Sequence, residues 1–168
     1  MVISPGLLTI CHPLKNRWKS CIIVTRMLHN VFVYGTLKRG EPNHYLLEKA
    51  ENGIGNFIVE GKTKTKYPLI IVTKYNIPCL LHYPGRGFHV RGEIYEVDDK
   101  MLSKLDKLEG HPNYATREID DIEVMRRQGN EIIKCWVYFL KQFKVELLSV
   151  PHLENYTSSG SHGKPYIA

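Results

Sequence analysis

Residues 30–40 read NVFVYGTLKRG, and this stretch decides how the chain begins to fold. Its first part, Asn30 to Tyr34, is a run of apolar, β-branched and aromatic residues that predicts a buried strand. Gly35 interrupts the run and predicts a sharp turn. A strand that enters such a turn leaves successive backbone N–H groups unpaired and pointing in one direction. Those groups can bind a carboxylate or an oxyanion without the help of a charged side chain.

The same turn does not fit two better-known anion sites. Gly35 and Gly40 have the separation of a phosphate-binding loop, but Glu41 and Pro42 stand where that loop requires Lys and Ser or Thr. The stretch also lacks the G-x-G-x-x-G pattern of a dinucleotide site. Judged from the glycine alone, a plain strand-ending turn is the better interpretation, and an anion-binding turn is the alternative.

Further along the chain, the pattern is rich in strands. Apolar periodicity and turn-forming residues predict strands near 56–65, 68–73, 78–83, 88–97, 115–126 and 131–140. Gln128-Gly129-Asn130 predicts a hairpin between the last two. A short helix is expected from Glu41-Pro42 to about Ala50, with proline at its first turn. Many strands with two short helices predict an α+β fold, a small mixed β-barrel flanked by short helices.

The second helix runs from a cap at Asp98 to about Glu109 and ends at Gly110. Its apolar stripe consists of Met101, Leu102, Leu105 and Leu108. Glu109 lies seven residues after Leu102 and therefore on the same face. Burial of its carboxylate and the negative end of the helix dipole both predict a raised pKa, as a general base requires. The alternative is that the helix frays at Leu108 and that Glu109 faces water.

Composition limits the classes of function. The chain has 168 residues and a net charge of +6, with 43% hydrophobic and 24% charged residues, as in a globular domain. Residues 1–30 hold four of the basic side chains and no acidic one, so the remainder is nearly balanced. We therefore expect no nucleic-acid partner. No apolar run is long enough for a membrane helix, and the scattered cysteines without a secretory signal predict a reduced, cytoplasmic compartment.

The pattern also predicts how the chain is divided into segments and whether it binds a metal or a cofactor. We expect a flexible leader at 1–28, one domain at 29–150, and a C-terminal tail at 151–168 that could pack near the site. Met27 is a candidate second start, and the leader is expected to be dispensable for folding. His82, His89 and Cys79 do not have the spacing of metal ligands, so we expect no metal and no cofactor. We expect a monomer.

The turn and Glu109 together resemble the γ-glutamylcyclotransferase family, and most closely its γ-glutamylaminecyclotransferase (AIG2-like) branch. The likeness spans about residues 29–166. The residues that carry it are Val31 to Gly40, Pro42-Asn43-His44, Tyr67-Pro68-Leu69, Asn76 to His82, Val90 to Tyr95, Leu105 to Glu109, and the tail from Pro151-His152 to Ser161-His162-Gly163.

This resemblance implies a barrel and an intramolecular reaction. The α-amine of a γ-glutamyl amide attacks the γ-carbonyl carbon and releases 5-oxoproline and a free amine, typically the lysine of γ-glutamyl-ε-lysine. It implies that Tyr34, Gly35, Thr36 and Leu37 hold the substrate and that Glu109 is the catalytic base, without any cofactor. Two alternatives are a sibling reaction on γ-glutamyl amino acids or peptides, which Thr36 disfavours mildly, and a non-enzymatic binding barrel, which Glu109 disfavours.

Overall fold

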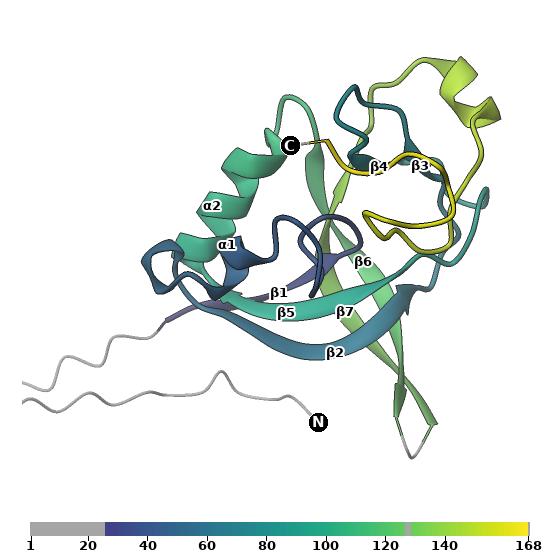
Figure 1. Cartoon of the computed structure of the whole chain (residues 1–168). Helices are drawn as coiled ribbons and strands as arrows, with labels where there is room; N and C mark the ends of the chain where they lie inside the picture. Colours follow the sequence, from purple (N-terminus) through teal and green to yellow (C-terminus); the bar gives the residue numbers. More distant parts are fainter. Residues whose placement is uncertain (1–25, 127–128, 168) are drawn as a thin grey trace, which may run out of the picture.

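The structure is a computed structural model that describes residues 26–126 and 129–167 (Figure 1). Residues 1–25, which make up most of the predicted leader, lie outside the described part of the chain.

A closed five-stranded barrel forms the body of the protein (Figure 1). In order around the barrel its strands are β1 (Leu28–Val33), β5 (Arg91–Asp98), β2 (Gly55–Thr63), β6 (Thr116–Arg126) and β7 (Gly129–Phe139). Neighbouring strands are antiparallel except β1 and β7, which are parallel and close the barrel. The prediction of a mixed barrel is therefore confirmed. The register pairs Arg126 with Gly129, which confirms the predicted hairpin.

Two predicted strands do not enter the barrel. β3 (Leu69–Ile71) and β4 (Pro78–Leu80) are only three residues long and pair with each other in a separate two-stranded sheet. They pack with the 3-10 helix η2 (Val145–Ser149), because Ile70, Cys79 and Leu148 belong to one buried apolar cluster. This small sheet covers one end of the barrel (Figure 1).

The helix predicted from Glu41-Pro42 to Ala50 is wrong in its start and its length. α1 spans Tyr45–Glu48, and the 3-10 helix η1 (Ala50–Asn52) follows it. The backbone N–H groups of Glu41 and Asn43 donate to carbonyls of the preceding turn, at 3.0 and 2.9 Å. These bonds hold the chain in a series of turns and delay the helix by one turn.

The second predicted helix is confirmed as α2 (Asp99–Glu109). Asp98 caps its start by accepting from the Met101 N–H at 2.9 Å, and Gly110 ends it in the left-handed conformation, φ 66°. Leu108 was wrongly placed in the apolar stripe, because it is 45% exposed. Buried residues of β1 and β5 pack against Met101 and Leu105, but Leu108, in the last turn of α2, does not belong to this apolar cluster.

Two apolar clusters lie on the two sides of the barrel wall. Side chains such as Phe32, Ile94 and Val137 fill the interior. Alternate residues of the same strands, such as Val31, point outward and pack under α2. β1 therefore contributes to both clusters, and the turn after it lies where the barrel, α2 and the β3–β4 sheet meet (Figure 1).

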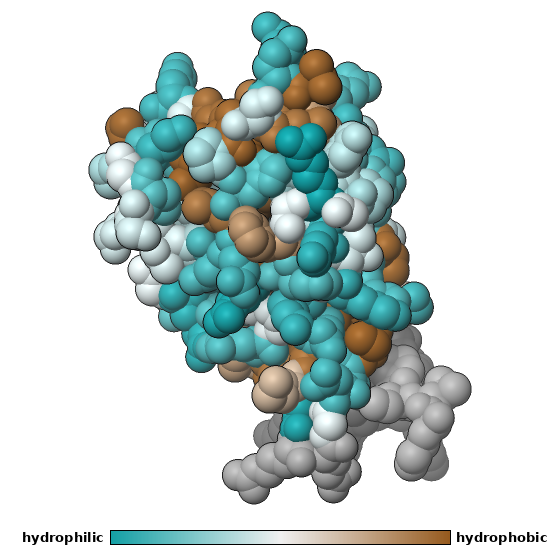
Figure 2. Space-filling model, turned by 90° about the vertical axis from the view of Figure 1, so that its right-hand side faces the viewer, coloured by the Kyte–Doolittle hydropathy of each residue, from teal (hydrophilic) through white to brown (hydrophobic). Residues whose placement is uncertain are grey.

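The C-terminal segment lies against the β3–β4 sheet (Figure 1). Tyr156 is fully buried, Lys164 donates to the Ile71 carbonyl at 2.9 Å, and Asn76 donates to the Pro165 carbonyl at 2.7 Å. On this side of the molecule, hydrophilic residues separate small groups of apolar ones (Figure 2). Among the described residues, no helix is long and apolar enough to cross a membrane.

Asp98 offers a test of what fixes α2 in place. Its Oδ1 accepts from the N–H groups of both Met101 and Ile54, at 2.9 and 3.1 Å. We expect Asp98→Ala to lower the free energy of unfolding by about 2 kcal/mol, because the helix loses its cap and the Ile54 N–H loses its partner. Urea denaturation measures this change. Asp99→Ala is the matched control and should cost less than half as much, because the Asp99 side chain is 72% exposed.

Candidate active site

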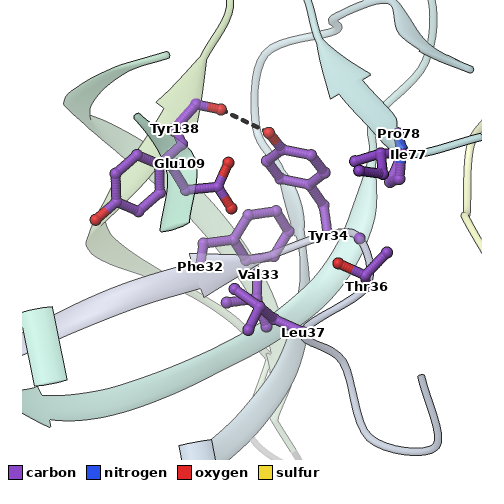
Figure 3. A pocket seen from close by; sticks show the side chains of 10 residues that line it. Phe32, Val33, Tyr34, Thr36, Leu37, Ile77, Pro78, Glu109 and Tyr138 are labelled. Carbon is purple, nitrogen blue, oxygen red and sulfur yellow. Dashed lines mark hydrogen bonds between the residues drawn. The ribbon is translucent and has the colours of Figure 1, made fainter. Parts of the chain in front are cut away.

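A small cavity lies at the end of β1 (Figure 3). Its volume is about 40 Å³, which is room for a few water molecules or for the reacting part of a small ligand. Four segments that are distant in sequence form its walls. The lining residues are Phe32, Val33, Tyr34, Gly35, Thr36, Leu37, Ile77, Pro78, Glu109 and Tyr138. All five residues that the sequence suggested, Tyr34 to Leu37 and Glu109, therefore meet in one cavity.

Glu109 reaches this cavity as the last residue of α2. Leu105, one turn earlier, is fully buried and anchors the helix on the barrel. The Gly110 N–H donates back to the carbonyls of Asp106 and Lys107, which closes the helix directly after Glu109. The helix therefore does not fray at this end, and the carboxyl group points toward the space beside the Tyr34 ring (Figure 3).

The Glu109 carboxyl group is buried without a compensating partner. The residue as a whole is partly exposed, but its carboxyl group faces the cavity between aromatic walls. No group in the described part of the chain donates a hydrogen bond to it. Burial raises its pKa to about 7, because the charged form loses hydration and gains nothing in return. The sequence-based prediction of a raised pKa is confirmed.

A polar pair holds α2 against the barrel beside Glu109. The Tyr138 hydroxyl donates to Asp106 Oδ1 at 2.7 Å, and the Arg117 guanidinium lies 3.3 Å from Asp106 Oδ2. Asp106 points away from the cavity and ties the last helical turn to β7 and β6. The Tyr138 backbone carbonyl accepts from the Tyr34 hydroxyl at 2.7 Å (Figure 3). Tyr138 therefore connects both halves of the site.

The turn after β1 has its carbonyls occupied and its N–H groups free. The Gly35 and Thr36 carbonyls accept from the N–H groups of Lys38 and Asn43, at 3.2 and 2.9 Å. The Leu37 carbonyl lies 3.1 Å from His44 Nδ1. By contrast, the N–H groups of Gly35, Thr36 and Leu37 have no acceptor within the described residues. Three successive donors beside a cavity form the kind of nest that binds an anion.

Gly35 is needed because Pro78 approaches it closely. A Cβ atom at Gly35 would lie 2.7 Å from Cγ of Pro78, too close for any real contact. The φ angle of Gly35 is not positive, so the requirement comes from this approach and not from backbone conformation. Pro78 begins β4, and together with Ile77 it forms the wall opposite the turn.

Glu93, on β5, anchors the far end of the turn. It is 7% exposed, and its carboxylate accepts from the Arg39 N–H, the Arg39 Nε–H and the Tyr95 hydroxyl, at 3.0, 3.1 and 2.9 Å. The two bonds from Arg39 fix the chain directly after the donors of the turn. Glu93 is one of three acidic residues in β5, so the sequence does not single it out, and the sequence analysis assigned it no role.

The sequence analysis assigned no role in the site to Pro78, Tyr138 or Tyr114. Burial raises the pKa of Tyr114 to about 12, with smaller contributions from Cys79 and from the Glu109 carboxylate. Cys79 Sγ lies 3.7 Å from the Tyr114 hydroxyl, and burial raises the pKa of this thiol. Long-range contacts of this kind leave no local pattern in the sequence. In the described ranges, no group of three or more His, Cys, Asp or Glu residues is arranged to hold a metal ion.

The burial of Glu109 can be tested through stability. Its pKa is about 7 in the folded protein against 4.5 ordinarily, so the carboxyl group costs no stability below pH 4.5, costs progressively more as the pH rises from 4.5 to 7, and carries its full penalty above pH 7. We expect Glu109→Gln to raise the melting temperature at pH 8 and to have little effect at pH 4. The shift corresponds to on the order of 3 kcal/mol. Glu51→Gln, which removes an exposed carboxylate, is the control; an equal effect of both variants at all pH values would contradict the burial.

Comparisons with known proteins agree with this geometry. Residues 31–158 match the family model "Gamma-glutamyl cyclotransferase, AIG2-like". A Drosophila melanogaster protein, CG2811, whose name describes it as a gamma-glutamylcyclotransferase, is 50% identical over 84% of this chain and 87% of its own length. Gamma-glutamylaminecyclotransferase from Rattus norvegicus is 42% identical over 82% of this chain and 95% of its own.

A solved structure shows the same fold. The crystal structure of an AIG2-like protein from Mus musculus superposes with a TM-score of 0.79 and 39% identity, over 84% of this chain and 96% of the other. The matched region of the family model contains both the turn and Glu109. The chain belongs to the gamma-glutamyl cyclotransferase, AIG2-like family.

Proposed function

We propose that this chain is a γ-glutamylaminecyclotransferase, which converts a γ-glutamyl amide such as γ-glutamyl-ε-lysine into 5-oxoproline and the free amine. One observation carries the proposal: a carboxyl group without a partner, with its pKa raised to about 7, shares a cavity with three unpaired backbone N–H groups. The names of the Rattus norvegicus and Homo sapiens relatives, both gamma-glutamylaminecyclotransferases, support this choice of amide.

Glu109 acts as the base in this mechanism. The substrate's α-ammonium gives a proton to the Glu109 carboxylate, and the freed amine attacks the γ-carbonyl carbon. A bond forms between the α-nitrogen and that carbon, and the bond from the carbon to the departing nitrogen breaks. Glu109 then returns this proton to the departing nitrogen and relays to it the second proton that the ring nitrogen loses, so that the products are a neutral lactam and an ammonium ion. A carboxyl pKa near neutrality suits both transfers, because the group can accept and release a proton at little cost.

The turn holds the substrate. Its three N–H groups suit two anions, the α-carboxylate of the glutamyl group and the oxyanion that develops on the γ-oxygen. The nucleophile belongs to the substrate, so the protein has to supply a folded glutamyl conformation more than a reactive side chain. The small cavity between Tyr34 and Pro78 favours a compact chain, and bringing two reacting atoms together accelerates ring closure strongly.

A second candidate is the sibling reaction on γ-glutamyl amino acids or peptides. The name of the Drosophila melanogaster relative favours it. Both reactions use the same site and release 5-oxoproline, so they differ only in the departing amine. Incubation with a panel of γ-glutamyl amines, amino acids and peptides, while 5-oxoproline is measured, distinguishes the two.

The surroundings of the enzyme are part of the proposal. We propose a cytoplasmic monomer that does not bind nucleic acid, with one catalytic domain at 29–150, a dispensable leader and a C-terminal tail. The nearly balanced charge after residue 30 supports the exclusion of nucleic acid. Cys79 and Cys135 are buried free thiols that form no disulfide bond with each other, which supports a reducing compartment.

The role of Glu109 leads to a kinetic prediction. Glu109→Gln keeps the size of the side chain but removes the proton acceptor, so we expect kcat for γ-glutamyl-ε-lysine to fall by about 10²–10⁴. Circular dichroism should show an unchanged fold. Near-normal turnover in this variant would contradict the assignment of the base.

The pH profile should report the same group. Glu109 must be ionised in order to accept a proton, so kcat/KM should rise with pH, roughly tenfold per pH unit, up to an apparent pKa of about 7. The residual activity of Glu109→Gln should lack this limb. A profile of the parent that is flat between pH 5 and pH 8 would exclude a base with this pKa.

The anion-binding role of the turn can be tested without turnover. We expect 5-oxoproline to raise the melting temperature of the parent and of Glu109→Gln. At 100 times its Kd, the ligand should add about 2.7 kcal/mol to the free energy of unfolding. Gly35→Ala should lose this protection, because the added methyl group meets Pro78 and shifts the donors. Should Gly35→Ala bind 5-oxoproline as well as the parent does, the substrate's anion must lie elsewhere, and Arg39 and Arg91 would be examined next.

A further inference from the structure

A second cavity lies beside the same turn. Its volume is about 260 Å³, and it is lined mainly by polar residues. The lining residues are Lys38, Glu60, Gly61, Arg91, Gly92, Glu93 and Asn155. Thr36 and Leu37 line the first cavity, and the next residue, Lys38, lines the second. One turn therefore forms a wall of both cavities.

Lys38 is a buried cation with unused donors. It is 8% exposed, and its one hydrogen bond in the described structure goes from Nζ to Asn155 Oδ1, at 2.6 Å. Within that part of the chain, no carboxylate oxygen lies within 4.0 Å of Nζ. Burial lowers the pKa of this amine, although Glu41, Glu93 and Glu60 at longer range oppose the shift. A lysine ammonium has three donors, so two remain available for a ligand.

The other charges around this cavity are already compensated. Arg39 pairs with both Glu93 and Glu60, at 3.1 and 2.9 Å. Arg91 pairs with Glu154 at 2.9 Å. Lys38 is thus the cation that an incoming anion would meet without breaking an ion pair.

Asn155 and Glu60 complete the chemistry of this cavity. Asn155 uses its Oδ1 to accept from Lys38, so its amide nitrogen keeps two donors for the same anion. Glu60 accepts from Arg39 through Oε1, and its Oε2, which has no hydrogen-bond donor among the described residues, remains as an acceptor at the opening, where the side chain is 74% exposed. A buried cation, with an exposed amide and an exposed carboxylate nearby, matches a ligand that carries both a carboxylate and an ammonium group.

We propose that this second cavity binds the amino-acid end of the departing amine, with its carboxylate on Lys38 and Asn155 and its ammonium at Glu60. The inference rests on the proposed function, in which that amine is a lysine bonded through its side-chain nitrogen. The free α-amino and α-carboxylate groups of such a lysine lie about 7 Å from the scissile nitrogen when the side chain is extended. They would therefore lie outside the first cavity, and the second cavity is next to it, because Leu37 lines one and Lys38 lines the other.

The alternative is a purely structural role, in which Lys38 only connects the turn to the C-terminal segment through Asn155. That role affects every substrate equally, whereas a binding role depends on the substrate's charged end. Three amides separate the two: γ-glutamyl-ε-lysine, γ-glutamyl-6-aminohexanoate, which keeps only the carboxylate, and γ-glutamyl-pentylamine, which has neither charge.

We expect Lys38→Met to lower kcat/KM about 10- to 100-fold for the two substrates with a carboxylate, mainly through KM, because a charged hydrogen bond is lost. For γ-glutamyl-pentylamine the change should stay within about threefold. Lys164→Met is the matched control, because Lys164 also holds the C-terminal segment, through the Ile71 carbonyl, but does not line this cavity. It should not discriminate among the three substrates.

An equal loss for all three substrates would overturn the proposal and leave Lys38 a structural role. Absence of 5-oxoproline release by the parent protein from all three would instead refute the proposed function. A binding measurement covers the case of an inactive variant: 6-aminohexanoate should raise the melting temperature of the parent and of Lys164→Met, but not of Lys38→Met. Equal protection of all three proteins would also overturn the proposal.

Discussion

Glu109 holds its carboxyl group in a cavity where none of the residues that the structure describes donates a hydrogen bond to it, and several contacts of α2 keep it there. A free carboxylate would normally turn to water or find a donor. Here the Asp98 cap, buried Leu105 and the bond between Asp106 and Tyr138 fix α2 along its length, and Gly110 ends the helix at the required residue. The cost of this burial is a raised pKa, and that raised pKa is what proton transfer near neutral pH requires.

The opposite half of the site, the turn after β1, also depends on which polar groups have hydrogen-bond partners. In the turn after β1 the carbonyls of Gly35, Thr36 and Leu37 are engaged by neighbouring groups, and Glu93 holds the chain that follows. Within residues 26–126 and 129–167, the N–H groups of Gly35, Thr36 and Leu37 have no acceptor. Backbone N–H groups can bind an anion of the substrate without a charged side chain. The Glu109 carboxylate, across the cavity, would supply the base. In our proposal, the cavity with Glu109 is where the ring closes, and the cavity with Lys38, on the other side of the turn, selects the departing amine.

The sequence was sufficient to predict the barrel, and its resemblance to the family implied that Glu109 and the turn form one site. Strand periodicity, the Asp98 cap and the Gly110 stop are local signals, and the structure confirms them. The contacts that shape the site are not local. Pro78 against Gly35, and Lys38 bonded to Asn155, join residues far apart in the chain, and no period or motif encodes such distances. α1 is shorter than predicted because backbone hydrogen bonds within the preceding turn hold the chain up to Asn43 out of the helix. Leu108 was mispredicted because the residues that cover Met101 and Leu105 leave it exposed.

The central claim is that Glu109 is a carboxyl group whose ionisation is set by burial in the site. The most direct measurement is a carbon-13 NMR titration of the Glu side-chain carboxyl groups, with the Glu109 resonance assigned by its absence in Glu109→Gln. We expect the Glu109 resonance to titrate with a midpoint of about pH 7. A midpoint near the ordinary value of 4.5 would contradict the account, because the carboxyl group would then be solvated or paired and could not act as the base described above.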